Sequence, residues 1–309
     1  MTPTPRTGRA RLNFLLFSIA AVGAGWLGLA LDRAAGEAGS NEVAFSSGEG
    51  TLGQLLFILG PAVAGLLLFF LSRDGAGPLG LTLKFEHRTR WFALATAFYP
   101  LATAVVLAGA LAVGAASLSV APDPGQPTFL AAFLAVFAVQ LIKNPIEEFA
   151  FRGYGTRTAM ALGFRGRVVP HLLAGAVWAA WHLPLYLMWT SEADMRLVTS
   201  LSAPVYLVLL FAGLMAASLL YGEMRVRTGS IWPGVLMHSM SNAIVTPLLV
   251  GGHLGFEGHS DVVFSPVPSA VLMIVLTAAT GLFLVTRLSN RTAATPDLAA
   301  TAAGPVRAR

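Results

Sequence analysis

The chain has 309 residues, of which 55% are hydrophobic and only 11% are charged, and its mean hydropathy is +0.70. A soluble domain carries roughly 25% charged residues, so this composition excludes an ordinary water-soluble protein and indicates a bilayer as the solvent. The absence of cysteine excludes disulfides, thiolate metal sites and cysteine nucleophiles. The net charge of +5 does not indicate nucleic acid, because the basic residues gather in alternate loops.

Apolar stretches of about 20 residues, the length that a helix needs to cross a bilayer, recur along the chain. The first follows Arg6, Arg9 and Arg11 and is longer than the core of a signal peptide, so we expect it to be retained. We predict an all-α, polytopic transmembrane helical bundle with about eight spans, near residues 12–31, 52–72, 91–115, 129–150, 169–189, 203–221, 231–250 and 266–286.

Basic residues lie in one set of alternating loops and at both ends of the chain. Of the 20 Lys and Arg residues, only Arg33 and Arg196 fall in the opposite loops. The positive-inside rule therefore predicts that both termini are cytoplasmic. The composition favours a bacterial inner (plasma) membrane protein. We divide the chain into three N-terminal spans (1–128), a core of four spans (129–250), and a last span with a tail (251–309) that we expect to be disordered from about Ser289.

The fourth span ends in the sequence EEFAFRG, residues 147–153. Carboxylates at membrane depth are costly and usually face a cavity or a partner. Glu148 and Arg152 are four residues apart, so they share a helical face and can pair. Glu147 points about 100° away from Glu148, which leaves it free to act as an acid or a base. The alternative is a cluster of charges that reach water from the end of a helix.

Two further spans place a histidine at helical spacing from another side chain. Trp178 and His182 share a face of the fifth span, and His238 and Asn242 share a face of the seventh. Each motif alone could be structural, as a histidine bonded to a carbonyl or as a hydrogen bond between helices. Because the other five spans hold almost no ionisable residues and isolated buried charges are costly, we expect the three motifs to meet in one pocket.

In this order, Glu-Glu-x-x-x-Arg, aromatic-x-x-x-His and His-x-x-x-Asn resemble the CPBP family of intramembrane metalloproteases. That family includes the type II CAAX prenyl endopeptidases and bacterial relatives linked to bacteriocin processing and immunity (the Abi proteins). The resemblance covers about residues 129–250, with Trp178 where the family often has Phe. It implies an intramembrane endopeptidase whose catalytic residues are Glu147, His182, His238 and Asn242, supported by Glu148, Arg152 and Trp178.

Peptide hydrolysis needs an activated water, an oxyanion site and a proton for the leaving amine. We expect Glu147 to be the general base, His182 to hold the water and shuttle its proton, and His238 and Asn242 to donate hydrogen bonds to the oxyanion. Alternatively, Glu147, His182 and His238 could ligate Zn²⁺, with Asn242 or water as a fourth ligand. A metal-free mechanism uses the same residues, and both stay open. The expected partners are a peptide or protein substrate that reaches the membrane and the lipid bilayer, not nucleic acid.

Two other classes of function compete with a peptidase. A proton-coupled transporter would use the Glu and His residues as a relay, but the repeated halves common in transporters are not evident. A non-catalytic family member would act as an immunity or scaffold protein. A peptidase site also requires Glu147 to lie at the same depth in the membrane as the two histidines. This is possible only if the fourth helix continues past Arg152, to about Arg157. We expect a cavity open to the cytoplasm beside the basic residues 152–167.

Overall fold

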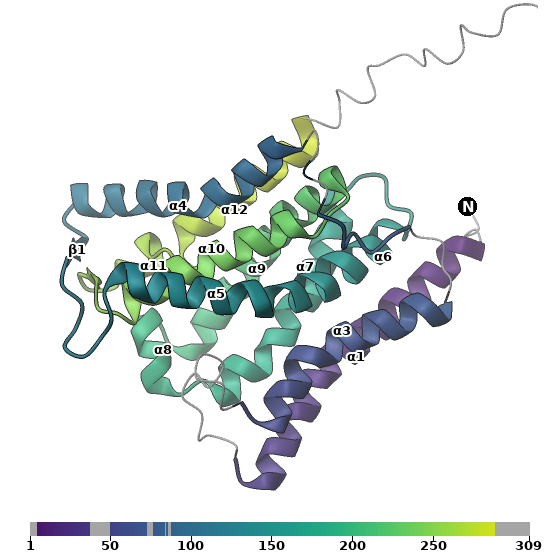
Figure 1. Ribbon diagram of the computed structural model, residues 1–309, viewed down its shortest axis with the longest axis horizontal. Helices are drawn as coiled ribbons and strands as arrows, with labels where there is room; N and C mark the ends of the chain where they lie inside the picture. Colours follow the sequence, from purple (N-terminus) through teal and green to yellow (C-terminus); the bar gives the residue numbers. More distant parts are fainter. Residues whose placement is uncertain (1–4, 38–49, 73–76, 84, 86–87, 288–309) are drawn as a thin grey trace, which may run out of the picture.

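The computed structural model describes residues 5–37, 50–72, 77–83, 85 and 88–287; the predicted disorder of the tail lies outside these residues. The described chain is a bundle of helices (Figure 1). Its elements are, in chain order, α1 (Pro5–Ala35), α3 (Leu52–Ser72), α4 (Thr89–Ala112), β1 (Ala116–Leu118), α5 (Phe129–Glu148), the π-helix η1 (Phe149–Thr156), α6 (Arg157–Met160), α7 (Val168–Pro184), the π-helix η2 (Leu185–Trp189), α8 (Glu192–Val198), α9 (Ala203–Thr228), α10 (Trp232–Leu249), β2 (Leu254–Phe256), α11 (Asp261–Phe264) and α12 (Val271–Arg287).

Within the described residues, six helical segments are long and apolar enough to cross a membrane: Gly8–Ala35, Leu52–Ser72, Thr89–Ala112, Phe129–Met160, Val168–Trp189 and Ala203–Thr228. The predicted all-α membrane bundle is therefore confirmed. α10 and α12 occupy the positions of the predicted seventh and eighth spans but are not among these six helices. α10 has only 18 residues, and they include the polar His238 and Asn242. The apolar part of α12, Val271–Thr286, is shorter still. The count of eight spans and the cytoplasmic position of both termini stay predictions.

In the structure, the helix of the fourth predicted span is longer than the apolar stretch from which it was predicted. The helix continues from α5 through η1 to α6 and ends at Met160, so the expected extension past Arg152 is confirmed. Two glycines let neighbours approach η1 closely: a Cβ at Gly153 would lie 3.2 Å from the carbonyl oxygen of Leu79, and a Cβ at Gly155 would lie 3.1 Å from a ring carbon of Phe17. Such π-helical turns are frequent at functional sites.

α9 is also longer than predicted, because it ends at Thr228 rather than near residue 221. Gly229 ends the helix with a left-handed φ of 62°, and its N–H donates to the carbonyl of Arg225. The extra turns place Glu223 inside a helix, where hydropathy had put it in a loop.

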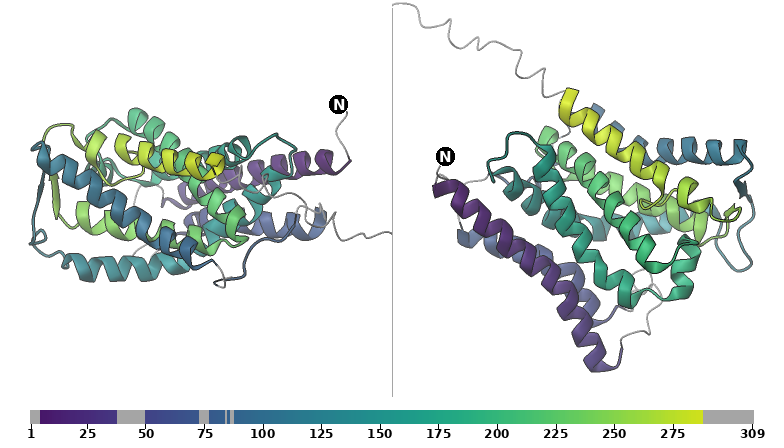
Figure 2. Two further views of the ribbon diagram at one scale, coloured as in Figure 1. Left: turned by 90° about the horizontal axis from the view of Figure 1, so that it is seen from above. Right: turned by 180° about the vertical axis from the view of Figure 1, so that it is seen from behind.

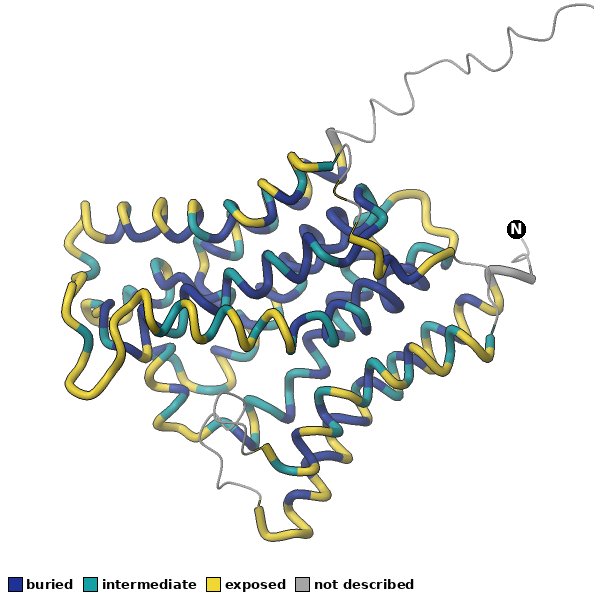
Figure 3. The backbone as a smooth tube through the Cα atoms, viewed as in Figure 1, coloured by how far each residue is buried: buried dark blue, intermediate teal, exposed yellow. Residues whose placement is uncertain are grey.

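The helices that carry the three motifs are neighbours in the bundle. α10 packs along α5 and also contacts α4 and α9, while α7 packs against α9 and α1. Seen from above, α5 and α12 lie on opposite sides of the molecule (Figure 2). α7, α9 and α10 are buried over most of their length, whereas α4 and α5 expose one face (Figure 3). The motifs of α5, α7 and α10 therefore have neighbours on several sides.

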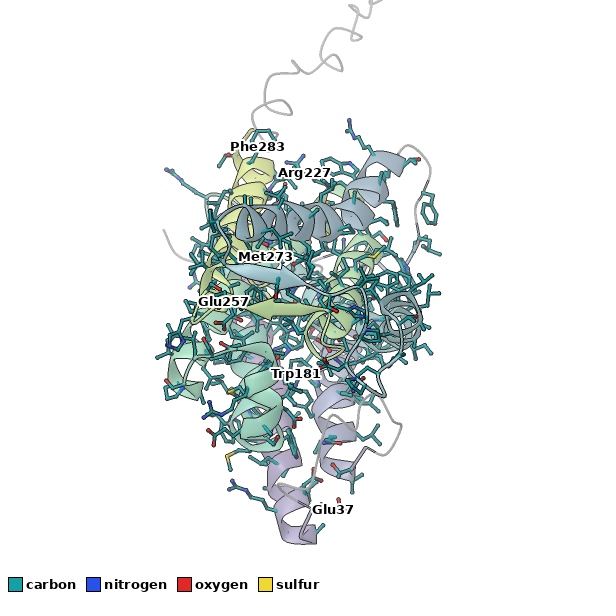
Figure 4. All side chains as sticks on the ribbon, turned by 90° about the vertical axis from the view of Figure 1, so that its left-hand side faces the viewer. Glu37, Trp181, Arg227, Glu257, Met273 and Phe283 are labelled. Carbon is teal, nitrogen blue, oxygen red and sulfur yellow. The ribbon has the colours of Figure 1, made fainter. Side chains whose placement is uncertain are left out.

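α1 and α3 pair along their length and form one side of the molecule. Asp32, at the end of α1, accepts hydrogen bonds from the backbone N–H of Gly53 at 2.8 Å and from Trp189 Nε1 at 2.9 Å. Phe57 of α3 stacks on Trp181 of α7 with ring centroids 4.1 Å apart, and Trp181 Nε1 donates to the carbonyl of Phe57 at 3.0 Å. Trp181 thus lies in the interior, where α3 meets α7 (Figure 4).

Residues 77–82, which we call the strap, cross the end of the bundle beside α6. Five of its carbonyls accept hydrogen bonds at 2.6–2.9 Å from groups that lie far along the chain, namely the side chains of Arg157, Arg225, Ser230 and Trp232 and the backbone N–H of Ile231. Gly80 has a φ of +81°, and a Cβ there would overlap the guanidinium of Arg225. The strap therefore joins the first three helices to the part of the chain that holds the motifs.

Small elements that the sequence did not predict lie in the connections. β1 and β2 form a two-stranded antiparallel sheet in which Ala116 is opposite Phe256, and it faces the viewer in Figure 4. The short helices α8 and α11 lie in the connections between predicted spans. None of the motif residues lies in these connections.

Candidate active site

Glu148 lies at the end of α5 and is fully buried, with two ionisable neighbours. Arg152 Nε is 3.4 Å from Glu148 Oε2, which is the predicted pair, and Arg152 is also fully buried. His238 Nδ1, from α10, is 3.2 Å from Glu148 Oε1. The sequence did not predict this second contact, which links the first motif to the third.

Trp178 lies between the three motifs. The guanidinium carbon of Arg152 is 4.2 Å from the centroid of the Trp178 ring and 5.3 Å from that of Tyr221. The imidazoles of His182 and His238 both lie edge-on to Trp178, each with its ring centroid 5.5 Å from that of the indole. A cation and two imidazoles therefore contact one buried aromatic side chain, and the predicted convergence of the motifs is seen.

Glu147 is 2% exposed and has a basic partner. Lys143, one turn earlier on α5, places its Nζ 2.8 Å from Glu147 Oε1. The expectation that Glu147 is free of a charged partner is therefore wrong. We had counted Lys143 among the cytoplasmic loop charges, although its four-residue spacing puts it on the same helical face as Glu147. Glu147 also interacts electrostatically with both His182 and His238, so the acid lies near the two imidazoles.

Both histidines use Nδ1 for a hydrogen bond inside the protein. His182 Nδ1 is 2.9 Å from the carbonyl oxygen of Trp178, and because a carbonyl only accepts, Nδ1 is the donor. Neutral His182 then carries its lone pair on Nε2. His238 Nδ1 likewise faces the carboxylate of Glu148, which leaves Nε2 as the nitrogen that can reach a ligand. This arrangement, in which a third group orients a histidine, is typical of catalytic imidazoles.

Asn242, one turn after His238 on α10, has a partner that the sequence analysis missed. Its Nδ2 donates to Oε1 of Gln140 on α5 at 3.1 Å. One turn further along α5, Asn144 Nδ2 donates to Ser239 Oγ at 3.1 Å. Gln140 and Asn144 could have been found by the same i, i+4 spacing that singled out the acids, because residues 140, 144 and 148 lie along one side of the helix.

Several buried polar atoms around Trp178 have no hydrogen-bonding partner in the described part of the chain. They are Glu147 Oε2, Glu148 Oε2, the three guanidinium nitrogens of Arg152, Trp178 Nε1, Asn144 Oδ1 and Ser241 Oγ. An unsatisfied buried polar group costs about 1–3 kcal/mol, so folded proteins keep few of them. These atoms lie on α5, η1, α7 and α10, and two of them, Arg152 Nε and Glu148 Oε2, have only each other as an ion-pair partner among the described residues.

The residues expected to bind zinc do not form a ligand set as they are arranged. Among the described residues, no three His, Asp or Glu side chains gather closely enough to hold one metal ion. Glu147 is paired with Lys143, and His238 with Glu148. We therefore derive no chemical step through a metal, and metal dependence stays a prediction for experiment.

A second buried ionisable cluster lies where α7 begins and α9 ends. Fully buried Glu223 pairs with Arg167 at 2.8 Å and with Arg227 at 2.7 Å, and its Oε2 is 3.3 Å from His171 Nε2. From the sequence we expect almost no ionisable residues outside the three motif-bearing spans. Glu223 and Arg227, which lie on α9, show that a helix without a motif also has them. Arg227 lies at the opposite end of the molecule from Glu37, which closely follows the end of α1 (Figure 4). The carboxylate of Glu223 has basic partners, as a structural cluster requires.

From the sequence we expect the site to open to the cytoplasm beside residues 152–167, and the described part of the structure does not show such a cavity at the site residues. A cavity of about 730 Å³ lies at this end, lined by residues 164–169, Val285 and Thr286, but no candidate site residue lines it. Arg152 and Arg157 are buried, and the strap packs against Gly153 and Arg157. The helix extends as expected, but its basic residues are buried: Arg157 donates to the strap carbonyl of Gly77, and Arg152 lies against Trp178.

Residues 124–244 match the family model of the type II CAAX prenyl endopeptidase Rce1-like family. The matched segment includes all seven candidate site residues, from Glu147 to Asn242. No curated protein matches the chain. The match supports the family resemblance inferred from the three motifs. Together with the six long apolar helices, it indicates an integral membrane protein that is similar to CAAX-type intramembrane peptidases.

Proposed function

From the match of residues 124–244 to the type II CAAX prenyl endopeptidase Rce1-like family, we propose that the protein hydrolyses a peptide bond near the cytoplasmic side of the membrane with a water activated by Glu147. The observation that supports this most is that His182 and His238 both lie against Trp178, with Glu147 near enough to interact electrostatically with the two imidazoles. The buried polar atoms without partners in the same place provide what a water molecule and a substrate peptide group could bond to.

In this proposal the water is bound between Glu147 and Nε2 of His182. Glu147 Oε2 accepts one water proton, and Nε2 of His182 accepts the other in a hydrogen bond, since Nδ1 donates to the carbonyl of Trp178. The water oxygen attacks the carbonyl carbon, while its proton passes to Glu147 and then to the leaving amine. Lys143 stays paired with the other carboxylate oxygen, Oε1, so Oε2 remains for the water.

The oxyanion is bound from α10 in this mechanism. Asn242 Nδ2 carries two N–H groups, of which Gln140 takes one, so the second can donate to the oxyanion. His238 can add a donor through Nε2 only when both ring nitrogens are protonated, because Nδ1 donates to Glu148. A single well-aligned donor typically contributes about 3–4 kcal/mol to the transition state.

Glu148 and Arg152 have a supporting role in the proposal. Their pair orients His238 from one side and lies against Trp178 on the other, so it fixes the ends of α5 and α10 relative to α7. None of these contacts specifically favours the transporter or the scaffold alternative.

The decisive variant is Glu147→Gln, which keeps the volume of the side chain but cannot accept the proton. In proteoliposomes, we expect the wild-type protein to cleave a membrane-anchored peptide and the variant to be slower by at least about 100-fold, with an unchanged melting temperature. Glu257→Gln, in the exposed loop after β2, is the control and should cleave normally. Full activity of well-folded Glu147→Gln protein would show that another group is the base.

The substrate class is tested in the same assay with two fluorogenic peptides that end in a CAAX motif, one farnesylated and one not. Cleavage of the farnesylated peptide alone would assign a prenylated substrate, and equal cleavage would remove the prenyl requirement. Comparison of membrane-protein termini in cells with wild-type and Glu147→Gln protein then identifies natural substrates. Proton transport without any cleaved peptide would contradict the peptidase.

A further inference from the structure

We propose that Gln140 is a positioning residue for the peptidase reaction, because it orients the carboxamide of Asn242 within a row of polar contacts between α5 and α10. This inference rests on the proposed function, since it concerns the oxyanion donor. It adds a residue that lies outside the three motifs.

Three side-chain contacts connect the two helices. Each pair consists of one residue from α5 and one from α10, with atoms 3.1–3.2 Å apart: Gln140 with Asn242, Asn144 with Ser239, and Glu148 with His238. On α5 the residues are spaced by four, and on α10 their partners run in the opposite direction, as expected for antiparallel helices that pack side by side. The contacts therefore fix how α10 is aligned along α5.

The three contacts differ in burial. Asn144 and Glu148 are fully buried, and His238 is 8% exposed, whereas Gln140 and Asn242 are half-buried. Packing holds the inner side chains in place, but the outermost carboxamide has more freedom to rotate. The hydrogen bond to Gln140 is thus the contact that fixes the rotation of the Asn242 amide.

The direction of this hydrogen bond matters for the chemistry. Gln140 Oε1 accepts from Nδ2 of Asn242, so Nδ2, and not Oδ1, faces α5. One N–H is used by Gln140, and the geometry of the planar amide then fixes where the second N–H points. If the amide turned over, the oxygen Oδ1 would replace the donor and would repel an oxyanion.

The test is a double-mutant cycle with Gln140→Leu, Asn242→Ala and the double variant, using the farnesylated CAAX-motif peptide in proteoliposomes. We expect Gln140→Leu to lower kcat by about 10- to 100-fold with little change in KM, as for a misplaced catalytic group. In the Asn242→Ala background the same substitution should have no further effect on kcat, because the group that it positions is gone. A purely structural role would lower activity equally in both backgrounds.

Gln54→Leu is the control, because Gln54 is a glutamine in another membrane helix that is more buried than Gln140, and its Oε1 accepts from the backbone N–H of Thr51. It should leave kcat within about twofold of wild type. Additive effects of Gln140→Leu and Asn242→Ala on kcat, or a wild-type kcat in Gln140→Leu, would overturn the inference while leaving the peptidase intact. Absence of cleavage by folded wild-type protein would instead overturn the proposed function, and the positioning role with it.

Discussion

Replacing Arg152 with Met should destabilise the protein strongly, because it removes one partner of a fully buried ion pair. Arg152 and Glu148 are both fully buried, so the substitution leaves a carboxylate with His238 as its remaining ionisable contact. Breaking a buried pair from one side costs about 3–5 kcal/mol. A change of 1 kcal/mol shifts Tm by about 2–4 °C in proteins of 150–250 residues, so we expect Tm to fall by roughly 6–20 °C.

The assay is thermal unfolding of the detergent-purified protein, followed by tryptophan fluorescence, with turnover measured on the same sample. The chain supplies a matched control in Glu192 and Arg196, which have the same i, i+4 spacing but are 79% and 71% exposed. Arg196→Met should change Tm by no more than about 2 °C, as for other exposed pairs. The double variant Glu148→Met/Arg152→Met should recover much of the stability of Arg152→Met, because no unpaired charge remains.

The reasoning fails if Arg152→Met melts within about 2 °C of wild type and loses only turnover. Arg152 would then contact the substrate, and its stacking on Trp178 would belong to the chemistry and not to the fold.

Three other perturbations test separate parts of the structure. Lys143→Met should lower kcat about tenfold, as expected if its ammonium contributes about 1.4 kcal/mol to keeping the base in place, whereas Lys143→Arg should retain most activity in the peptide assay. Turnover should survive dialysis against EDTA, because no three ligand side chains gather in the described residues; a loss that zinc restores would show that the two histidines move together to bind it. Gly28→Ala should cost about 1–3 kcal/mol in thermal unfolding, because its Cβ would overlap the carbonyl of Gly53, whereas Gly23→Ala, with nothing within 4 Å, should be neutral or stabilising. Equal melting of the two glycine variants would contradict the close approach of α1 and α3.

The positions of the helices could be predicted from hydropathy, but their ends could not. A hydropathy window loses its signal where charged residues accumulate, so the sixth predicted span ends near residue 221, before Glu223, and the fourth ends near 150, before Arg152. In the structure these charges are paired inside the protein: Glu223 with Arg167 and Arg227, and Glu148 with Arg152. Pairing lets a helix continue through charged residues, and a single sequence does not show which charges will pair.

The candidate site could be predicted as a group of residues, but the contacts within it could not. Helical spacing linked Glu148 to Arg152, and the cost of isolated charges predicted that the three motifs meet. The contacts between helices, such as Glu148 with His238 and Gln140 with Asn242, depend on how α10 is aligned along α5. Spacing within one helix contains no information about that alignment. The contact between Lys143 and Glu147 could have been predicted from the same four-residue spacing. It was missed because Lys143 was counted among the basic residues of a cytoplasmic loop.

The strap has a consequence for the order in which the protein is made. Its carbonyls accept hydrogen bonds from Arg157 and from four donors in residues 225–232, so most of its partners are synthesised about 150 residues later. At about 5–20 residues per second, the ribosome needs roughly 8–30 s to reach them. During that time α1 and α3 can be inserted and paired with each other, but their link to α9 and α10 cannot form. A nascent chain that stalls before Arg225 therefore lacks the four donors that bond to Pro78, Gly80, Leu81 and Thr82 in the finished protein.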